Sequence, residues 1–270
     1  MGHEAVHVTV WNDSGSDAPR VLLVHGTMTW GTDCFAAQRP LADAFRLDVM
    51  DRRGFGDSPD IERSDYEVDA DDVVELLGAS AHLVGYSYGG VVAMIAAARK
   101  PEAVRSLALI EPSALRVAEE HPVVAAALDR LRATVGAERE PVSPEDYLRM
   151  STEPYGLPCP ELTPRRIRAT RTSMDERPCW DAQITLAPLA AATWPKLVVN
   201  GTWETAAQPY REFVGDAIAA TGQFIAERIG ADAVRVAGTD HYPHQDRHQV
   251  VNELLREFWT QGRSKTPVIM

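Results

Sequence analysis

Short apolar runs alternate with longer amphipathic stretches along most of the chain, and this alternation predicts strands and helices in turn. Near-continuous apolar runs at residues 20–25, 81–85 and 106–111 are typical of central strands that are covered on both faces. Further strands are predicted at residues 46–51, 196–200 and 233–237, and an edge strand at residues 6–11. The pattern favours an α/β fold with a mostly parallel central sheet and helices on both faces.

Helices are predicted between the strands, where apolar side chains recur every three or four residues. Residues 66–77 (YEVDADDVVELL) combine an acidic face with valines and leucines that can face inward. Residues 89–100 are alanine-rich and apolar almost throughout, so this helix is expected to be buried against the sheet and to end before Pro101. Other helices are expected at residues 35–44, 210–229 and 248–259.

The alternation is interrupted between residues 113 and 195, where prolines punctuate several helical stretches and no strand is predicted. The helical stretches are residues 123–135, 145–150, 165–172 and 180–189. We interpret residues 113–195 as a helical lid inserted into a core domain that residues 1–112 and 196–270 form together.

Composition and charge exclude some classes of binding partner and favour one cellular compartment. The 270 residues carry a net charge of −12, which argues against nucleic acid or an anionic membrane as a partner. Cys34, Cys159 and Cys179 have no CxxC spacing, so neither a disulfide framework nor a zinc site is expected. No apolar run approaches the roughly 18 residues of a membrane span, and residues 1–10 lack the apolar core of a signal peptide. We therefore expect a cytoplasmic protein.

The motif GYSYG at residues 85–89 stands between a predicted strand and a predicted helix. A strand-to-helix turn this tight holds the serine in a strained backbone conformation, and a β-carbon at position 85 or 89 would collide with the neighbouring chain. The strain lifts the hydroxyl clear of the sheet, and the following helix points its positive end at that place. Ser87 is therefore the candidate nucleophile.

A second glycine-containing turn, DRRGFGDSP at residues 51–59, also follows a predicted strand. Its Gly54-x-Gly56 spacing suggests a dinucleotide-binding loop, but Pro59 occupies the position of the last glycine, and no helix can start there. No nucleotide cofactor is therefore expected. The turn has the form D-x-R-G-x-G-x-S instead.

Together these motifs resemble the α/β-hydrolase superfamily. The resemblance rests on His25-Gly26 after a central strand, the D-x-R-G-x-G-x-S turn, the serine turn and a late glycine–histidine loop at residues 238–241. It covers nearly the whole chain outside the lid. It implies the α/β-hydrolase fold, with the functional residues at the carboxyl ends of strands in one parallel sheet.

The resemblance assigns a role to each motif. Ser87 is the nucleophile, and His241, in the loop after the last predicted strand, is the base that takes its proton. The backbone N–H groups of Thr27 and Tyr88 form the oxyanion hole. His25 is interpreted as a structural hydrogen-bonding residue that places Thr27.

A second histidine lies three residues after His241. We interpret His244 as a solvated loop residue and His241 as the catalytic one. The His-x-x-His spacing also suggests a metal pair, but no third group of ligands accompanies it, so no metal is expected.

Two carboxylates compete for the third position of the triad, which orients the imidazole and stabilises its positive charge. Many members of the superfamily place an aspartate three residues after the glycine that ends the seventh strand, and Glu204 stands there. Others place a carboxylate directly after the sixth strand, and Glu111 stands there. An unpaired carboxylate is costly to bury, so Glu111, at the end of an apolar strand, requires a partner and is narrowly favoured. Alternatively, Glu204 caps the following helix, or Glu111 braces the lid.

These assignments predict a serine hydrolase that cleaves a small-molecule carboxylic ester or lactone through an acyl-enzyme, without a cofactor. A C–C bond hydrolase or an acyltransferase would use the same triad, and the sequence does not separate them because substrate geometry in the lid decides. A receptor that keeps the fold and binds a ligand without catalysis is an alternative from a different class. The serine, the histidine and the two carboxylates favour catalysis.

Overall fold

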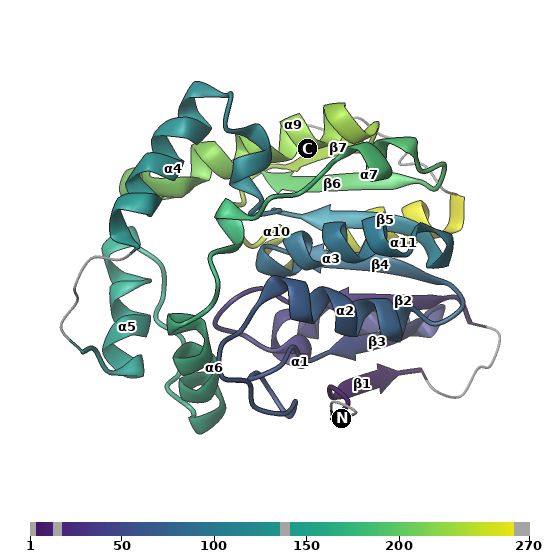
Figure 1. The fold of residues 1–270 in the computed structure, drawn as a ribbon, viewed down its shortest axis with the longest axis horizontal. Coiled ribbons are helices and arrows are strands. Elements are labelled where there is room, and N and C mark those ends of the chain that lie inside the picture. Colours follow the sequence, from purple (N-terminus) through teal and green to yellow (C-terminus); the bar gives the residue numbers. More distant parts are fainter. Residues whose placement is uncertain (1–3, 13–17, 136–140, 262–270) are drawn as a thin grey trace.

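The computed structural model describes residues 4–12, 18–135 and 141–261, which form one sheet with helices on both faces (Figure 1). In this part of the chain, seven strands are ordered β1-β3-β2-β4-β5-β6-β7 across the sheet. β1 runs antiparallel to β3, and the other neighbours are parallel. The strands are β1 Val8–Trp11, β2 Arg20–Val24, β3 Arg46–Met50, β4 Ala81–Tyr86, β5 Val104–Ile110, β6 Lys196–Gly201 and β7 Asp232–Val236. The predicted fold class is confirmed, and each predicted strand coincides with an observed one.

The parallel strands bring their carboxyl ends to one edge of the sheet. In the register, Val24 of β2 pairs with Gly85 of β4, and Gly85 pairs with Leu109 of β5. The loops that follow these three strands therefore lie next to one another. They are the loops on which the sequence places the candidate nucleophile, one oxyanion donor and one candidate acid.

Helices cover the two faces of the sheet with separate hydrophobic clusters. One face carries α2 (Tyr66–Leu77) and α3 (Tyr88–Arg99), and the other carries α1 (Gly31–Cys34), the 3-10 helix η1 (Ala36–Asp43) and α11 (His248–Gln261). α3 is buried from Tyr88 to Ala97, as its alanine-rich sequence predicts. This buried helix begins directly after the candidate nucleophile, so the packing of the core sets where that residue stands.

Several helices lie between β5 and β6, in a stretch that we call the insertion (residues 113–195). Its described residues contain no strand, and Figure 1 shows α4, α5 and α6 beyond the carboxyl ends of the parallel strands. The elements of the insertion are η3 Leu115–Ala118, α4 Pro122–Thr134, α5 Pro144–Met150, η4 Glu153–Tyr155, α6 Pro164–Met174, η5 Cys179–Asp181 and α7 Ala187–Ala191. The remaining elements are η2 Pro101–Ala103, α8 Gln208–Tyr210, the π-helical turn η6 Arg211–Gly215, α9 Asp216–Ile229 and α10 Pro243–Asp246.

Two predicted helices are wrong in detail, and proline is the physical reason in both. Residues 35–44 form the 3-10 helix η1 over most of their length, because Pro40 lies inside the segment and cannot donate an α-helical hydrogen bond. Residues 180–189 do not form one helix, since η5 ends at Asp181 and α7 begins at Ala187. Pro188 fits the first turn of α7, where its missing N–H costs nothing.

Two expectations from composition can be compared with the structure. Cys34, Cys159 and Cys179 are free thiols, of which Cys34 and Cys179 are buried. None of the helices in the described ranges has the length and apolar character that a bilayer-spanning helix needs.

His82 of β4 gives the stability of the fold a pH dependence. Its ring is buried, its Nδ1 lies 2.7 Å from the Ser106 hydroxyl, and burial together with Arg105 lowers the pKa of His82 to about 4. As the pH falls, the His82 ring is therefore protonated in the unfolded chain before it is protonated in the folded protein. The unfolding free energy decreases as the pH falls from above 6.5 towards 4. We expect the decrease in unfolding free energy between pH 7.5 and 5.5 to be about 1 kcal/mol smaller in His82→Gln than in the wild type. Urea denaturation at both pH values measures it, and equal decreases in the two proteins would contradict the assignment.

Candidate active site

Ser87 lies between the end of β4 and the start of α3 and has a strained backbone. Its φ of 53° and ψ of −115° form a conformation that non-glycine residues rarely adopt. A β-carbon on Gly85 would lie 2.2 Å from the carbonyl oxygen of Gly89, and one on Gly89 would lie 2.1 Å from that of Val24. The collisions predicted from the sequence are confirmed, so both glycines are needed for the strand and helix to meet this closely.

The structure brings Ser87 and His241 together from distant parts of the chain. The Ser87 hydroxyl oxygen lies 3.0 Å from Nε2 of His241. His241 stands in the loop between β7 and α10, which turns at Gly238 with a φ of 69°. The His241 side chain is mostly buried, with 12% of its surface exposed. At this distance the imidazole can take the hydroxyl proton directly.

Glu111 lies on the other side of the His241 ring. Its Oε2 is 3.5 Å from Nδ1 of His241, an ion-pair distance that is longer than an ordinary hydrogen bond. The carboxylate is fully buried, and it accepts hydrogen bonds from the Gly201 backbone N–H and from Nε1 of Trp203. Glu111 itself has a φ of 47°, which turns the chain sharply after β5. These two donors fix the orientation of the carboxylate, with Oε2 facing Nδ1 of His241.

Glu204, the competing carboxylate, has a different environment. Its side chain is exposed, and its Oε1 accepts a hydrogen bond from the Gly238 backbone N–H at 3.1 Å. It therefore joins the loop after β6 to the loop after β7. The geometry brings Glu111 to Nδ1 of His241, whereas the contact described for Glu204 is to the backbone.

The loops that carry the two expected oxyanion donors lie against the nucleophile. Tyr88 is the first residue of α3, so its N–H is one of those that a helix leaves unpaired at its start. Thr27 follows β2 directly after Gly26, and a β-carbon built on Gly26 would lie 3.1 Å from Cβ of Ser87. Both donors therefore belong to segments that adjoin the Ser87 side chain.

His25 is fully buried and holds the backbone of two loops. Its Nε2 accepts the backbone N–H of Arg52 at 3.0 Å, and its Nδ1 lies 2.7 Å from the carbonyl oxygen of Gly26. Burial lowers the pKa of His25 well below its usual value, with the Arg52 charge acting in the same direction. The interpretation of His25 as a structural hydrogen-bonding residue is confirmed.

His244 is not a solvated loop residue, and that expectation is wrong. The short helix α10 places its ring inside the protein, 4.3 Å from the Tyr86 ring centroid, with no exposed surface. Its Nε2 lies 3.6 Å from Sγ of Cys34. Burial lowers the pKa of His244 to about 3. The imidazole is therefore neutral and packs inside the protein against Tyr86, and it does not face water.

Comparison with known proteins identifies the family. Residues 21–254, most of the chain, match the family described as the alpha/beta hydrolase family. The chain belongs to this family.

Curated relatives match part of this α/β hydrolase. A pimeloyl-[acyl-carrier protein] methyl ester esterase of Neisseria meningitidis serogroup C is 37% identical over 126 residues, which cover 44% of this chain and 47% of that protein. The esterase of the same name from Aeromonas salmonicida is 36% identical over 110 residues, 40% of this chain and 43% of that one. The chain thus spans less than half the length of the curated relatives that it matches.

Solved structures resemble the α/β hydrolase over nearly its whole length. The enol-lactonase from Burkholderia xenovorans LB400 is 22% identical with a TM-score of 0.62, covering 95% of this chain and 96% of that one. Est816, described as an N-acyl homoserine lactone degrading enzyme, is 22% identical with a TM-score of 0.61, covering 94% and 100%. At this level of identity the likeness concerns the fold.

Two residues at the site have no part in the sequence-based assignment. The Ser113 hydroxyl lies 3.2 Å from the Ser87 hydroxyl, and the Trp203 indole donates to Glu111. Ser113 stands two positions after the candidate acid, which is a local signal in the sequence. The role of Trp203 had no such signal, because its contact with Glu111 joins residues 92 positions apart.

One group of side chains in the described residues has ligand atoms close enough for a metal ion. Atoms of His7, Asp51 and Asp57 lie within 4.8 Å of one another. The guanidinium of Arg165 already lies 2.8 Å from a carboxylate oxygen of Asp57 and 3.3 Å from one of Asp51. Arg165 thus supplies the positive charge that these carboxylates require, and the group is better explained as an ion-pair network.

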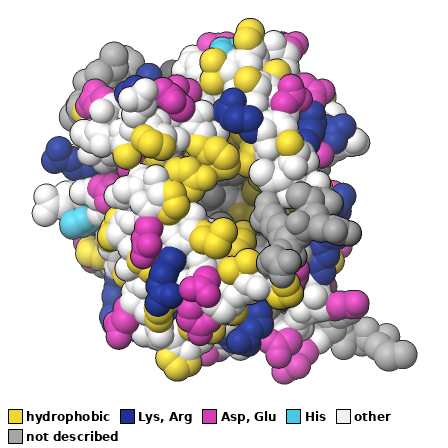
Figure 2. All heavy atoms as spheres, turned by 90° about the vertical axis from the view of Figure 1, so that its left-hand side faces the viewer, with side chains coloured by type: hydrophobic (Ala, Val, Ile, Leu, Met, Phe, Trp, Pro, Cys, Tyr) yellow, Lys and Arg dark blue, Asp and Glu magenta, His cyan; other side chains and the backbone are white. Residues whose placement is uncertain are grey.

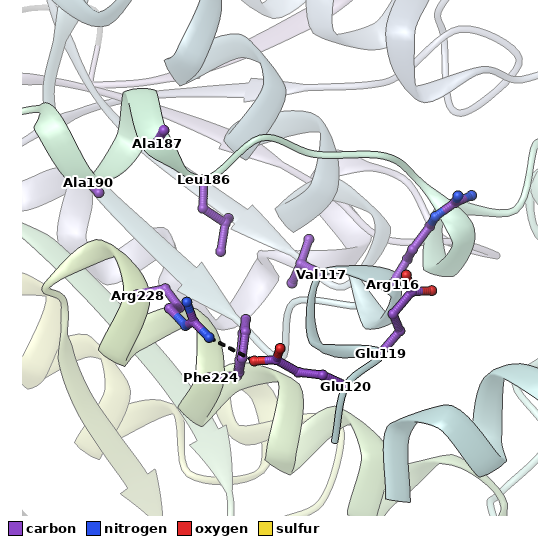
Figure 3. A pocket seen from close by; sticks show the side chains of 9 residues that line it. All are labelled: Arg116, Val117, Glu119, Glu120, Leu186, Ala187, Ala190, Phe224 and Arg228. Atoms are coloured by element: carbon purple, nitrogen blue, oxygen red, sulfur yellow. Dashed lines mark hydrogen bonds and ion pairs between the residues drawn. The ribbon is translucent and has the colours of Figure 1, made fainter. Parts of the chain in front are cut away.

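A separate cavity of about 580 Å³ lies between η3, α7 and α9 (Figure 3). Phe224 and Leu186 are among the residues that line it, and an ion pair between Arg228 and Glu120, 2.7 Å long, lies at one side. Neither Ser87 nor His241 is among its lining residues, so it is distinct from the candidate active site. Figure 2 shows a hollow near the centre of the face on which α4, α5 and α6 lie, with hydrophobic side chains among the described residues beside it.

Proposed function

We propose that this α/β hydrolase cleaves a carboxylic ester or lactone through an acyl-enzyme on Ser87. The observation that carries the proposal is the series of contacts from the Ser87 hydroxyl to His241 at 3.0 Å and from His241 to Glu111 at 3.5 Å. A serine hydroxyl is a weak nucleophile at neutral pH, and a base within hydrogen-bond distance activates it.

The reaction follows from these positions in two steps. The Ser87 oxygen attacks the carbonyl carbon while Nε2 of His241 takes its proton, and Glu111 stabilises the resulting imidazolium. The backbone N–H groups of Thr27 and Tyr88 bind the negative oxygen of the tetrahedral intermediate. The protonated His241 then gives its proton to the leaving alcohol, and in the second step it activates a water molecule that hydrolyses the acyl-enzyme.

The substrate class rests on the insertion and on the relatives. We propose that the insertion forms a lid over the site, because α4, α5 and α6 stand at the carboxyl ends of the parallel strands (Figure 1), and Ser87 and His241 follow two of these strands. The hollow in the face on which these helices lie has hydrophobic side chains beside it, which suits an apolar acyl group (Figure 2). Proteins named as methyl ester esterases and lactonases are among the relatives and structural neighbours. An apolar ester or lactone of small to medium size is therefore the proposed substrate.

A panel of p-nitrophenyl esters of graded acyl length, measured beside a panel of lactones, tests this proposal. We expect kcat/KM to rise about three- to fourfold for each methylene added to a short acyl chain, because each buried methylene contributes about 0.8 kcal/mol. The rise should stop when the chain fills the hollow. In parallel, an organophosphonate should label Ser87 covalently, as mass spectrometry of the peptide detects. A well-folded protein that is not labelled and hydrolyses no ester or lactone would contradict the proposal and favour a receptor.

A further inference from the structure

The peptide bond between Gly26 and Thr27 is held through its carbonyl group. The Gly26 oxygen accepts a hydrogen bond from Nη2 of Arg52 at 3.0 Å and lies 2.7 Å from Nδ1 of His25. Because Nε2 of His25 already accepts a backbone N–H, the neutral ring carries its proton on Nδ1 and donates it to the same oxygen. In a trans peptide the N–H points away from the C=O. These two bonds therefore set the direction of the Thr27 N–H, the proposed oxyanion donor.

Arg52 is in turn held by a buried charge network. Its side chain has no exposed surface, and its two terminal nitrogens lie 2.9 Å from Asp69 of α2 and 2.7 Å from Glu176 of the insertion. Its guanidinium also lies 4.1 Å from the ring centroid of Tyr88, the residue with the second proposed oxyanion donor. One buried guanidinium thus contacts the peptide group of one proposed donor and the side chain of the residue that carries the other, and two carboxylates pair with it.

Glu176 makes a second contact with the same loop. While its Oε1 pairs with Arg52, its Oε2 accepts a hydrogen bond from the Thr27 hydroxyl. The segment before it continues the contact, since Ser173 accepts the Met28 backbone N–H at 2.9 Å. The Glu176 side chain is only 7% exposed. The insertion therefore holds the loop after β2 on both sides of the Thr27 N–H.

We propose that Glu176 is a positioning residue for the reaction and that it couples the insertion to the oxyanion hole. This inference rests on the proposed hydrolase function. Glu176 acts through Arg52 on the Gly26–Thr27 peptide and through the Thr27 hydroxyl on the same residue. A movement of the insertion that withdrew Glu176 would leave the buried Arg52 with one carboxylate and release the loop. The oxyanion hole is thus complete when the insertion is docked.

The variant Glu176→Gln tests this role, because it keeps the size of the side chain and removes the charge that Arg52 and Thr27 contact. We expect kcat for a p-nitrophenyl ester to fall roughly 10- to 100-fold, less than the loss of a whole oxyanion donor, with KM changed less than about threefold. The rate of labelling by an organophosphonate should fall by a similar factor, since its phosphonyl oxygen occupies the same hole. Asp175→Asn is the matched control, an equal charge change at the neighbouring exposed position, and it should retain the wild-type rates.

Thr27→Val is a second variant, which removes the hydroxyl contact and leaves the backbone N–H and the Arg52–Glu176 pair in place. We expect a decrease in kcat of roughly three- to tenfold at unchanged KM. This variant therefore tests the positioning role of Glu176 if Glu176→Gln does not fold. If wild-type protein is labelled at Ser87 but these variants keep its kcat, or if only KM rises, the positioning role is wrong and the proposed function stands. Wild-type protein that is neither labelled nor active contradicts both.

Discussion

Replacement of Ser87 with alanine is expected to lower kcat/KM for the best p-nitrophenyl ester by roughly 10⁵- to 10⁶-fold. The reason is that the hydroxyl becomes covalently bound in the proposed mechanism, and the contact given for the neighbouring Ser113 hydroxyl, 3.2 Å away, is to Ser87 and not to His241. Residual activity would come from a water molecule activated by His241 and from the oxyanion donors. The same variant should lose organophosphonate labelling completely.

The control for this experiment is Ser80→Ala, the same substitution at an exposed position in the turn before β4. It should retain wild-type activity and labelling. Because Ser87 has a φ of 53°, alanine inherits the same backbone strain, and the urea midpoint of Ser87→Ala should stay close to that of the wild type. A Ser87→Ala protein that retains more than about a hundredth of the wild-type kcat/KM would contradict the role of nucleophile.

Glu111→Gln is expected to have the second largest effect, a decrease in kcat of roughly 10³- to 10⁴-fold with little change in KM. The amide has no negative charge with which to stabilise the imidazolium. It also has one acceptor oxygen for the two donors, Gly201 N–H and Trp203 Nε1, that the carboxylate satisfies. One of these buried donors would then be left without a partner, so a lower urea midpoint is expected as well.

Glu204→Gln is the matched control, since it makes the same chemical change in the carboxylate that competed for this role. Its side chain is exposed and an amide oxygen can still accept the Gly238 N–H, so we expect kcat within about threefold of the wild type. Steady-state kinetics of the two variants on one substrate decide between the acids. The opposite pattern, with Glu204→Gln impaired and Glu111→Gln active, would overturn the assignment.

The fold and the serine turn of this α/β hydrolase could be predicted because their determinants are close together in the sequence. A buried parallel strand is a short apolar run, and the turn needs Gly85 and Gly89 at two positions on either side of Ser87. The α-helix expected at residues 35–44 is wrong, and its cause also lies within that segment. Pro40 converts an expected α-helix into the 3-10 helix η1.

The site is different, because it depends on contacts between residues far apart in the chain. The sequence offered Glu111 and Glu204 after two different strands and favoured Glu111 only narrowly, and the structure separates them by the direction in which each loop turns. Glu111 turns inward to meet His241, whereas Glu204 lies on the surface. His244 was expected in solvent, and its burial against Tyr86 depends on how α10 packs under the sheet edge.

The sequence by itself determined where the strands occur along the chain, which serine is the candidate nucleophile and which loop carries the histidine. Each of these is a pattern within a few neighbouring residues. Only the tertiary structure decided which carboxylate meets His241 and which side chain of the insertion reaches the Thr27 loop. Glu176 is 149 residues from Thr27 and belongs to no motif. The physical reason is that a charged side chain takes its function from the groups buried around it, and those groups are assembled only when the sheet and the insertion pack together.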